Sequence, residues 1–181
     1  MKYTSLAALS IALLLNATHA EAQTHAAFRK GTAIRTITSD EAAIRHWLDR
    51  WAKVFSAHDL NGIKSLYAPD VVAYDLVPPL EYRGRDAYLK DYSELLSQYD
   101  GPIAVEYRDL HVVTSGNLGF AAGLEQISGT LKGGEKSAMW ARFTSEFRKV
   151  KGRWLDFHDH VSVPVDMATG KAALDLKPPK D

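Results

Sequence analysis

The chain has 181 residues, and its 22 basic residues balance 22 acidic ones. With no net charge and no basic patch, nothing in the composition favours a nucleic acid or an anionic membrane as partner. The absence of cysteine excludes a disulfide framework, a thiolate nucleophile and a zinc site built on sulfur.

The first residues have the pattern of an export signal. Lys2 gives a short positive segment, and residues 6–15 form an apolar run that is too short to span a membrane. Cleavage after Ala20 or after Ala22 fits the small residues found there. We therefore expect a signal peptide at residues 1–22 and a periplasmic or secreted protein without membrane contact after its removal; a retained membrane anchor is the alternative.

The remaining chain has the length of one domain with its own core. Residues 23–37 show no sustained periodicity and are expected to be a flexible lead-in. A single domain is predicted at residues 38–166. Residues 167–181 contain Gly170 and two prolines and are expected to be a mobile tail.

Three helices are predicted in the first half of the domain. Thr38 and Glu41 form a capping box, and apolar residues then recur at helical spacing as far as Phe55. Helical patterns are also found at residues 60–67 and 85–99. A β-branched run at residues 71–75 predicts a short strand between them.

The second half of the domain has the pattern of a sheet. Strand-like runs at residues 103–113, 118–128, 138–150 and 154–163 are separated by short turns. Consecutive strands joined by short turns favour an antiparallel sheet. The sequence thus predicts an α+β fold, with three N-terminal helices packed on a curved, mostly antiparallel sheet.

Several motifs fall at the spacings of one known group of proteins. They are Arg50-Trp51, His58-Asp59-Leu60, Leu66-Tyr67-Ala68-Pro69-Asp70, Asp75, Gly84-Arg85, Gly152-Arg153-Trp154 and His158-Asp159-His160-Val161-Ser162. In these motifs and in its element order the chain resembles the SnoaL-like and ketosteroid-isomerase-like proteins of the nuclear transport factor 2-like superfamily. The resemblance covers most of residues 39–164 and implies the cone-shaped fold of that superfamily for residues 38–166.

The resemblance also implies roles for individual residues. Asp75 falls where ketosteroid isomerase has its general base. Tyr67 and Tyr92 fall where that enzyme has two tyrosines that support its oxyanion tyrosine, and Trp51 replaces the oxyanion tyrosine itself. The partner aspartate of the oxyanion hole falls on Phe143 or Thr144.

Both donors of the isomerase's oxyanion hole are therefore missing or changed. The indole N–H of Trp51 can donate a hydrogen bond, but indole is too weak an acid to share a proton with an enolate. We therefore do not expect this chain to carry out the isomerase's steroid chemistry with the residues at these positions.

The pattern of residues, taken without the resemblance, also makes Asp75 the first candidate for a functional residue. Val71, Ala73 and Asp75 share one face of the predicted strand, so an acid ends an apolar row. In an apolar cavity its pKa would be raised, which would make it a usable general base. The alternative is an Asp that caps a turn near Pro78.

Alternation along residues 154–163 places Leu155, Phe157, Asp159 and Val161 on the inward face. Asp159 is then an acid on an apolar face, which should be paired or functional. Arg83 or Arg85 is the expected partner. An Asp75–Asp159 pair across one cavity would raise the pKa of one carboxyl. The expected pocket residues are Trp51, Phe55, Tyr67, Tyr92, Phe143, Phe157, Asp159 and Val161.

The same alternation directs His158, His160 and Ser162 outward, where relatives have a subunit interface. We expect these residues to contribute to a homodimer. Two imidazoles on one face are also half of a metal site, but only His111 or Asp156 could complete it, so no metal ligand is predicted.

Three functional hypotheses follow. The domain binds a small organic molecule in an apolar pocket, with Asp75 as a polar contact. Alternatively, Asp75 acts as the general base of a cofactor-free isomerase, cyclase or dehydratase. As a third possibility, the domain is a non-catalytic dimerisation module. The chain has no nucleophile elbow, P-loop or dinucleotide fingerprint, so no cofactor is expected.

Overall fold

A computed structural model of the chain describes residues 37–179. The chain divides after Thr36, and the domain begins at Ile37. The predicted signal peptide and all but the last residue of the predicted lead-in lie outside the described residues. In the described part, no helix has the length and apolar character needed to cross a membrane.

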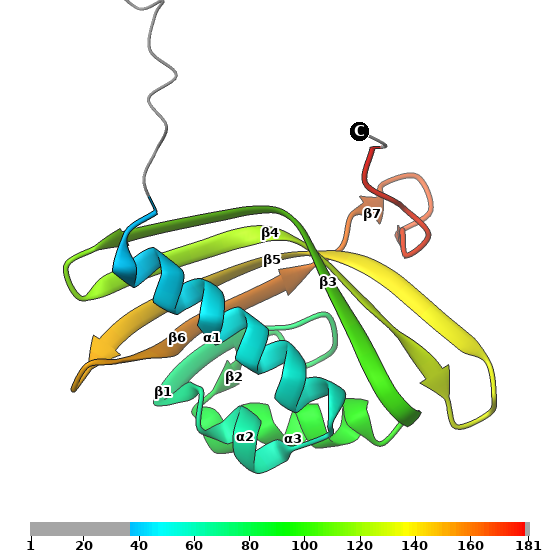
Figure 1. Ribbon diagram of the computed structural model, residues 1–181. Coiled ribbons are helices and arrows are strands. Elements are labelled where there is room, and N and C mark those ends of the chain that lie inside the picture. Colours follow the sequence, from blue (N-terminus) through cyan, green and yellow to red (C-terminus); the bar gives the residue numbers. More distant parts are fainter. Residues whose placement is uncertain (1–36, 180–181) are drawn as a thin grey trace, which may run out of the picture. The chain divides into compact units, whose positions relative to one another are not determined.

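The order of elements confirms the predicted α+β fold (Figure 1). In chain order the elements are α1 (Ser39–Ser56), α2 (Leu60–Lys64), β1 (Tyr67–Tyr74), β2 (Tyr82–Arg83), α3 (Arg85–Leu96), β3 (Tyr99–Ser115), β4 (Leu118–Leu131), β5 (Lys136–Val150), β6 (Arg153–Ser162), β7 (Val165–Asp166) and β8 (Lys171–Ala172).

Helix α1 begins at the predicted capping box. The backbone N–H of Glu41 donates to Thr38 Oγ1 at 3.1 Å, and that of Thr38 donates to Glu41 Oε2 at 3.4 Å. Both bonds satisfy donors that a helix leaves open at its N-terminus. The apolar stripe of the helix is buried from Ile44 to Phe55. Figure 1 shows α1 lying across the concave side of the large sheet.

The large sheet has the strand order β2-β1-β6-β5-β4-β3. Only the β1–β6 pair is parallel, and the other pairs are antiparallel. Helices α2 and α3 lie at the end of the sheet that contains β1 (Figure 1). This arrangement encloses a core between the helices and the concave face of the sheet.

Irregularities in the ladders accompany the curvature of the sheet. In β3 the pairing register shifts between Arg108 and His111, where Asp109 has a φ of 51°. Gly123 faces this bulge from β4, and a Cβ there would lie 2.8 Å from the carbonyl oxygen of Arg108 and 3.2 Å from the ring of Phe143. The missing side chain thus lets the two strands approach closely at the bulge.

Some element boundaries differ from the prediction. The helix predicted at residues 60–67 ends at Lys64, because Tyr67 already pairs with Asp156 of β6. The helix predicted at residues 85–99 ends at Leu96, and Tyr99 begins β3. Residues 165–166 and 171–172 pair as a small hairpin within and just before the segment that we expected to be a tail.

Candidate functional site

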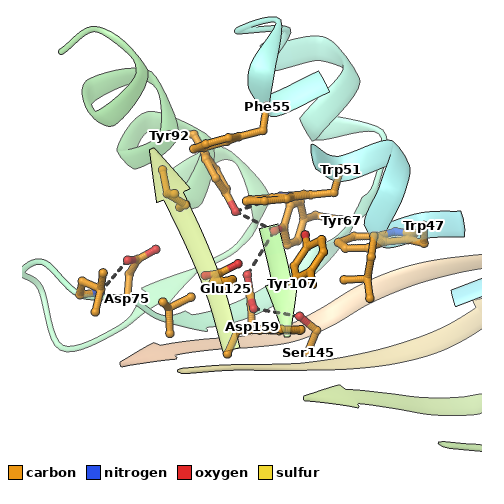
Figure 2. Close-up of a pocket in the computed structure, with 15 residues that line it drawn as sticks. Trp47, Trp51, Phe55, Tyr67, Asp75, Tyr92, Tyr107, Glu125, Ser145 and Asp159 are labelled. Atoms are coloured by element: carbon orange, nitrogen blue, oxygen red, sulfur yellow. Dashed lines mark hydrogen bonds between the residues drawn. The ribbon is translucent and has the colours of Figure 1, made fainter. Parts of the chain in front are cut away.

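A pocket lies between the helices and the concave face of the sheet. Its cavity measures about 50 Å³, inside an envelope of about 490 Å³ that includes the open mouth. A cavity of this size has room for a few water molecules. The residues that line it are Trp47, Leu48, Trp51, Phe55, Tyr67, Asp75, Leu76, Tyr92, Tyr107, Glu125, Ile127, Phe143, Ser145, Asp159 and Val161 (Figure 2).

Aromatic side chains from different elements form much of the wall. On α1, the rings of Trp51 and Phe55 stack with centroids 4.7 Å apart. On the sheet, the rings of Tyr107 and Phe143 lie 5.4 Å apart. Of the eight side chains that we expected to line the pocket, seven do so, and Phe157 does not.

Phe157 faces away from the pocket because of a bulge that the sequence pattern did not reveal. Glu146 pairs with His158, but the next residue of β5, Phe147, pairs with Asp156. One residue of β6 is therefore skipped, which reverses the alternation on its N-terminal side. As a result Asp156 is fully buried, and Phe157 lines a separate surface hollow beside Glu146.

Asp159 lies at the centre of a hydrogen-bond cluster (Figure 2). Its Oδ2 accepts from the hydroxyls of Tyr67 at 3.1 Å and Tyr88 at 3.0 Å, and its Oδ1 accepts from Ser145 Oγ at 3.1 Å. Burial, and next the charge of Asp75, raise the pKa of Asp159 to about 6, although the hydroxyl donors oppose this rise. The predicted ion pair with Arg83 or Arg85 is wrong.

Arg83 and Arg85 contact groups other than Asp159. Arg83 is exposed and forms an ion pair with Glu81, and the guanidinium of Arg85 donates to backbone carbonyls at the end of α2 and the start of β1. Hydroxyl groups take their place, because they can satisfy a buried carboxylate without bringing in a second charge.

The indole N–H of Trp51 donates its hydrogen bond within this cluster and is therefore not available to a group in the cavity. Its nitrogen lies 3.3 Å from the hydroxyl oxygen of Tyr92, which is 2.7 Å from that of Tyr67. Because Tyr67 and Tyr88 both donate to Asp159, the one hydroxyl proton of Tyr92 is shared between Tyr67 at 2.7 Å and Tyr88 at 3.4 Å as acceptors. The side chains that match the isomerase's oxyanion tyrosine and its supporting tyrosines are thus all linked to a carboxylate of the protein itself.

Asp75 follows the last residue of β1 and is half-buried in the pocket wall. Its Oδ1 accepts from the backbone N–H of Leu76 at 2.5 Å. Behind it lies Asp91 of α3, which accepts from the hydroxyl of Tyr82 at 2.9 Å. Burial, and next the charge of Asp75, raise the pKa of Asp91 to about 6. Asp75 therefore has features of both interpretations from sequence. Its carboxylate accepts a hydrogen bond within its own turn, and its side chain also lines the cavity.

Glu125 on β4 is a pocket residue that we did not predict. It is 5% exposed and makes no hydrogen bond or ion pair with the described part of the chain. Burial, and next the charges of Asp159 and Asp75, raise its pKa to about 8. The signal was present in the sequence, because strand alternation places Glu125 in the inward row with Ala121, Gly123 and Ile127.

The residues predicted for an interface gather at the opposite face of the sheet. Tyr74 of β1 is 41% exposed, and the rings of His158 and His160 contact it edge-on at 4.9 and 5.8 Å. Asp156 points into the core and cannot join these histidines as a ligand. Among the described residues, no group of three or more potential ligands is placed to hold a metal ion.

Comparison with known proteins identifies the family. The SnoaL-like domain matches residues 44–166, which is more than half of the chain, so the chain belongs to the SnoaL-like domain family. An NTF2-like protein of unknown function from Pseudomonas putida is 32% identical, with a TM-score of 0.71 over 79% of this chain and 100% of that one.

A ketosteroid isomerase-like protein from Erwinia carotovora atroseptica has the same fold, at 20% identity and a TM-score of 0.60 over 69% of this chain and 96% of that one. Among curated sequences, 55 residues are 36% identical to part of the dynein-1-alpha heavy chain, flagellar inner arm I1 complex, of Chlamydomonas reinhardtii. That match covers 30% of this chain, which spans only about 1% of the dynein's length.

The raised pKa of Glu125 predicts how stability depends on pH. The folded state holds this proton up to about pH 8, whereas an unfolded glutamate releases it near 4.5. The native state thus binds more protons in between, so the free energy of unfolding falls as pH rises, by up to about 1.4 kcal/mol per pH unit for one such group. Glu125→Gln should flatten this fall between pH 6 and 8, measured by chemical denaturation.

Glu106→Gln is the matched control, because Glu106 is an exposed glutamate on the neighbouring strand β3. The control should keep the slope of the wild type. Equal slopes for the wild type and Glu125→Gln would show that Glu125 is ionised in the native state throughout this range.

Proposed function

We propose that this SnoaL-like domain binds a small organic ligand in the pocket, with Asp75 in contact with the ligand's polar group. The observation that carries the proposal is one cavity with aromatic walls that is also lined by three acids, Asp75, Glu125 and Asp159. Ligand sites in proteins have this character, being mostly apolar with a few convergent polar groups.

The burial of the lining residues supports an entrance near Asp75. Five lining side chains are only half-buried: Asp75, Leu76, Tyr107, Ile127 and Val161. The other ten lining side chains are buried, and they include Trp51, Phe55 and Tyr92. A ligand entering between the half-buried side chains would meet the carboxyl of Asp75 first and then the aromatic floor. Its buried part must be small to fit the cavity without rearrangement.

The oxyanion chemistry of ketosteroid isomerase receives no support from the site. An oxyanion needs donors directed at it. Here the donors of Trp51, Tyr67 and Tyr92 are directed toward one another and toward Asp159. The proposal therefore rests on ligand binding and not on that reaction.

Native mass spectrometry of the purified protein tests the proposal. A small molecule should remain bound in the native spectrum and be released on denaturation. Asp75→Asn should weaken its binding roughly tenfold, because the substitution removes the charge of a polar contact at nearly unchanged size. Asp100→Asn is the matched control, since Asp100 is exposed and does not line the pocket.

The proposal fails if no molecule is retained and none of a panel of small ligands binds.

We also propose that the protein is exported. This proposal rests on the pattern of residues 1–22 alone. The same spectra test export, because they give the mass of the mature chain. Loss of residues 1–20 or 1–22 is the expected result, and an intact N-terminus would contradict it.

A second candidate function is cofactor-free acid–base catalysis, such as an isomerisation, cyclisation or dehydration. It is favoured by two carboxyls in one pocket, half-buried Asp75 and buried Glu125, because burial raises the pKa of Glu125 to about 8. Groups whose environments separate their pKa values are able to act as base and acid near neutral pH. In this candidate Asp75 accepts a proton from a carbon next to a carbonyl, and protonated Glu125 donates one.

Deuterium exchange into the bound molecule tests catalysis without knowledge of the product. In D₂O, reversible proton abstraction should add deuterium to a C–H position of the ligand, as measured by mass spectrometry. Asp75→Asn should abolish this gain in mass, although the ligand remains partly bound. A gain in mass that persists in Asp75→Asn would remove Asp75 as the base.

We also propose that the domain forms a homodimer through the outer face of the sheet. Tyr74 with His158 and His160 lies there, and the paired Phe120 and Val113 are 39% and 50% exposed. Exposed apolar groups of this kind are found at protein interfaces. A dimer is expected in light scattering, and His160→Glu should shift it toward a monomer, whereas Lys132→Glu in the β4–β5 turn should not. A wild-type monomer at high concentration would contradict the proposal.

A further inference from the structure

The charge inside the pocket is of one sign. Its fifteen lining residues include three acids, Asp75, Glu125 and Asp159, and no lysine, arginine or histidine. The described ion pairs, such as Arg148–Asp70 and Lys149–Asp40, involve none of these three acids. Buried carboxylates without a cation are unfavourable, because burial removes the water that would stabilise their charge. The pocket therefore leaves acidic groups uncompensated.

Most donors of the pocket are already in use, and the hydroxyl of Tyr107 is the exception among the described lining residues. The indole N–H of Trp47 donates to the carbonyl oxygen of Leu66 at 3.2 Å. The donors of Trp51, Tyr67 and Ser145 are occupied in the cluster around Asp159, as described above. A ligand in the cavity thus meets mainly carboxyl groups and aromatic faces, and a positively charged ligand can compensate the acids.

Of the three lining acids, Glu125 is the one without a hydrogen-bond donor among the described residues. Its side chain is buried and lacks a hydrogen bond within the described residues, and Figure 2 shows its carboxyl group directed into the space between the walls. Three titratable groups on other elements influence it or are influenced by it: Asp159 of β6, Asp75 after β1 and Tyr107 of β3. None of the three carries positive charge, so this carboxyl has no counterion among the described residues.

The aromatic walls provide the second requirement for binding a cation. Trp51, Phe55, Tyr107 and Phe143 line the same cavity as Glu125. Aromatic faces attract cations through their quadrupole, and cages of aromatic rings with nearby acids are the usual sites for ammonium groups in proteins. The small cavity limits the buried group to a few non-hydrogen atoms.

We infer that the ligand of this pocket carries a positively charged ammonium group, which lies among the aromatic walls next to the carboxyls of Glu125 and Asp159. The inference rests on the proposed ligand-binding function and specifies the chemical class of the ligand. A cation next to Glu125 stabilises the ionised form of its carboxyl group, which burial otherwise disfavours, and needs no donor from the protein. A neutral ligand of the same shape would leave the carboxyls uncompensated, and an anion would be repelled.

Titration calorimetry with two probes of nearly equal shape tests the inference. Choline carries a quaternary ammonium group, and 3,3-dimethylbutan-1-ol is its neutral counterpart. With the purified protein at pH 7, choline should bind at least roughly tenfold more tightly, as expected for a cation among aromatic rings and acids. Choline binding should also release protons, because the cation favours the ionised form of Glu125; measurements in two buffers of different ionisation enthalpy detect this release.

Glu125→Gln separates the charge from the shape of the site. The variant should lose roughly tenfold in affinity for choline, release fewer protons and keep its affinity for the neutral alcohol. Glu106→Gln, in which an exposed glutamate of β3 is changed, should behave as the wild type. The comparison of the two probes on the wild type holds even if Glu125→Gln folds poorly.

Equal or tighter binding of the neutral alcohol would overturn the inference and leave the proposed ligand pocket intact. Binding of neither probe would also overturn it, and the native mass spectra then decide independently whether the pocket holds another ligand. Loss of choline binding in Glu106→Gln as well as in Glu125→Gln would place the cation outside the pocket and contradict the inference.

Discussion

The architecture depends on one buried carboxylate, Asp159, that is held by hydroxyl groups instead of a cation. Its donors come from β1, α3 and β5, so the same group joins the helices to the concave face of the sheet. An ionised carboxylate at this depth is costly unless its oxygens are satisfied. Loss of one donor therefore disturbs both the packing of α3 on the sheet and the charge in the pocket.

The same constraint bears on the ligand that we propose for the pocket. In ketosteroid isomerase the donors at the corresponding positions serve an oxyanion of the substrate, whereas here Asp159 is the acceptor. The donors at the matching positions therefore form no oxyanion hole, and the cavity is left with carboxyl groups, aromatic faces and the hydroxyl of Tyr107. Membership of the SnoaL-like family defines the fold. The particular charges in the pocket, rather than the fold, indicate the ligand.

The sequence predicted what depends on local patterns. The capping box at Thr38, the apolar stripe of α1 and the strand runs are local signals, and the fold inferred from them is confirmed. Strand alternation predicted Asp159 inward, but it was wrong for Phe157, because one skipped residue reverses alternation and no local motif marks the bulge. The partners of Asp159 were also missed, since tyrosines from α3 and β1 reach it only through tertiary packing. Glu125 was not predicted, although it is an acid in the inward-facing, otherwise apolar row of β4.

The most direct test of the account is a titration of the carboxyl groups by NMR, with ¹³C labels on the side chains of Asp and Glu. Two acids of the pocket, Asp159 and Glu125, are buried and have no counterion among residues 37–179. Their burial predicts midpoints near pH 6 for Asp159 and near pH 8 for Glu125. Midpoints near the ordinary values of 3.8 and 4.5 would mean that water or a cation reaches both groups, and would contradict the account.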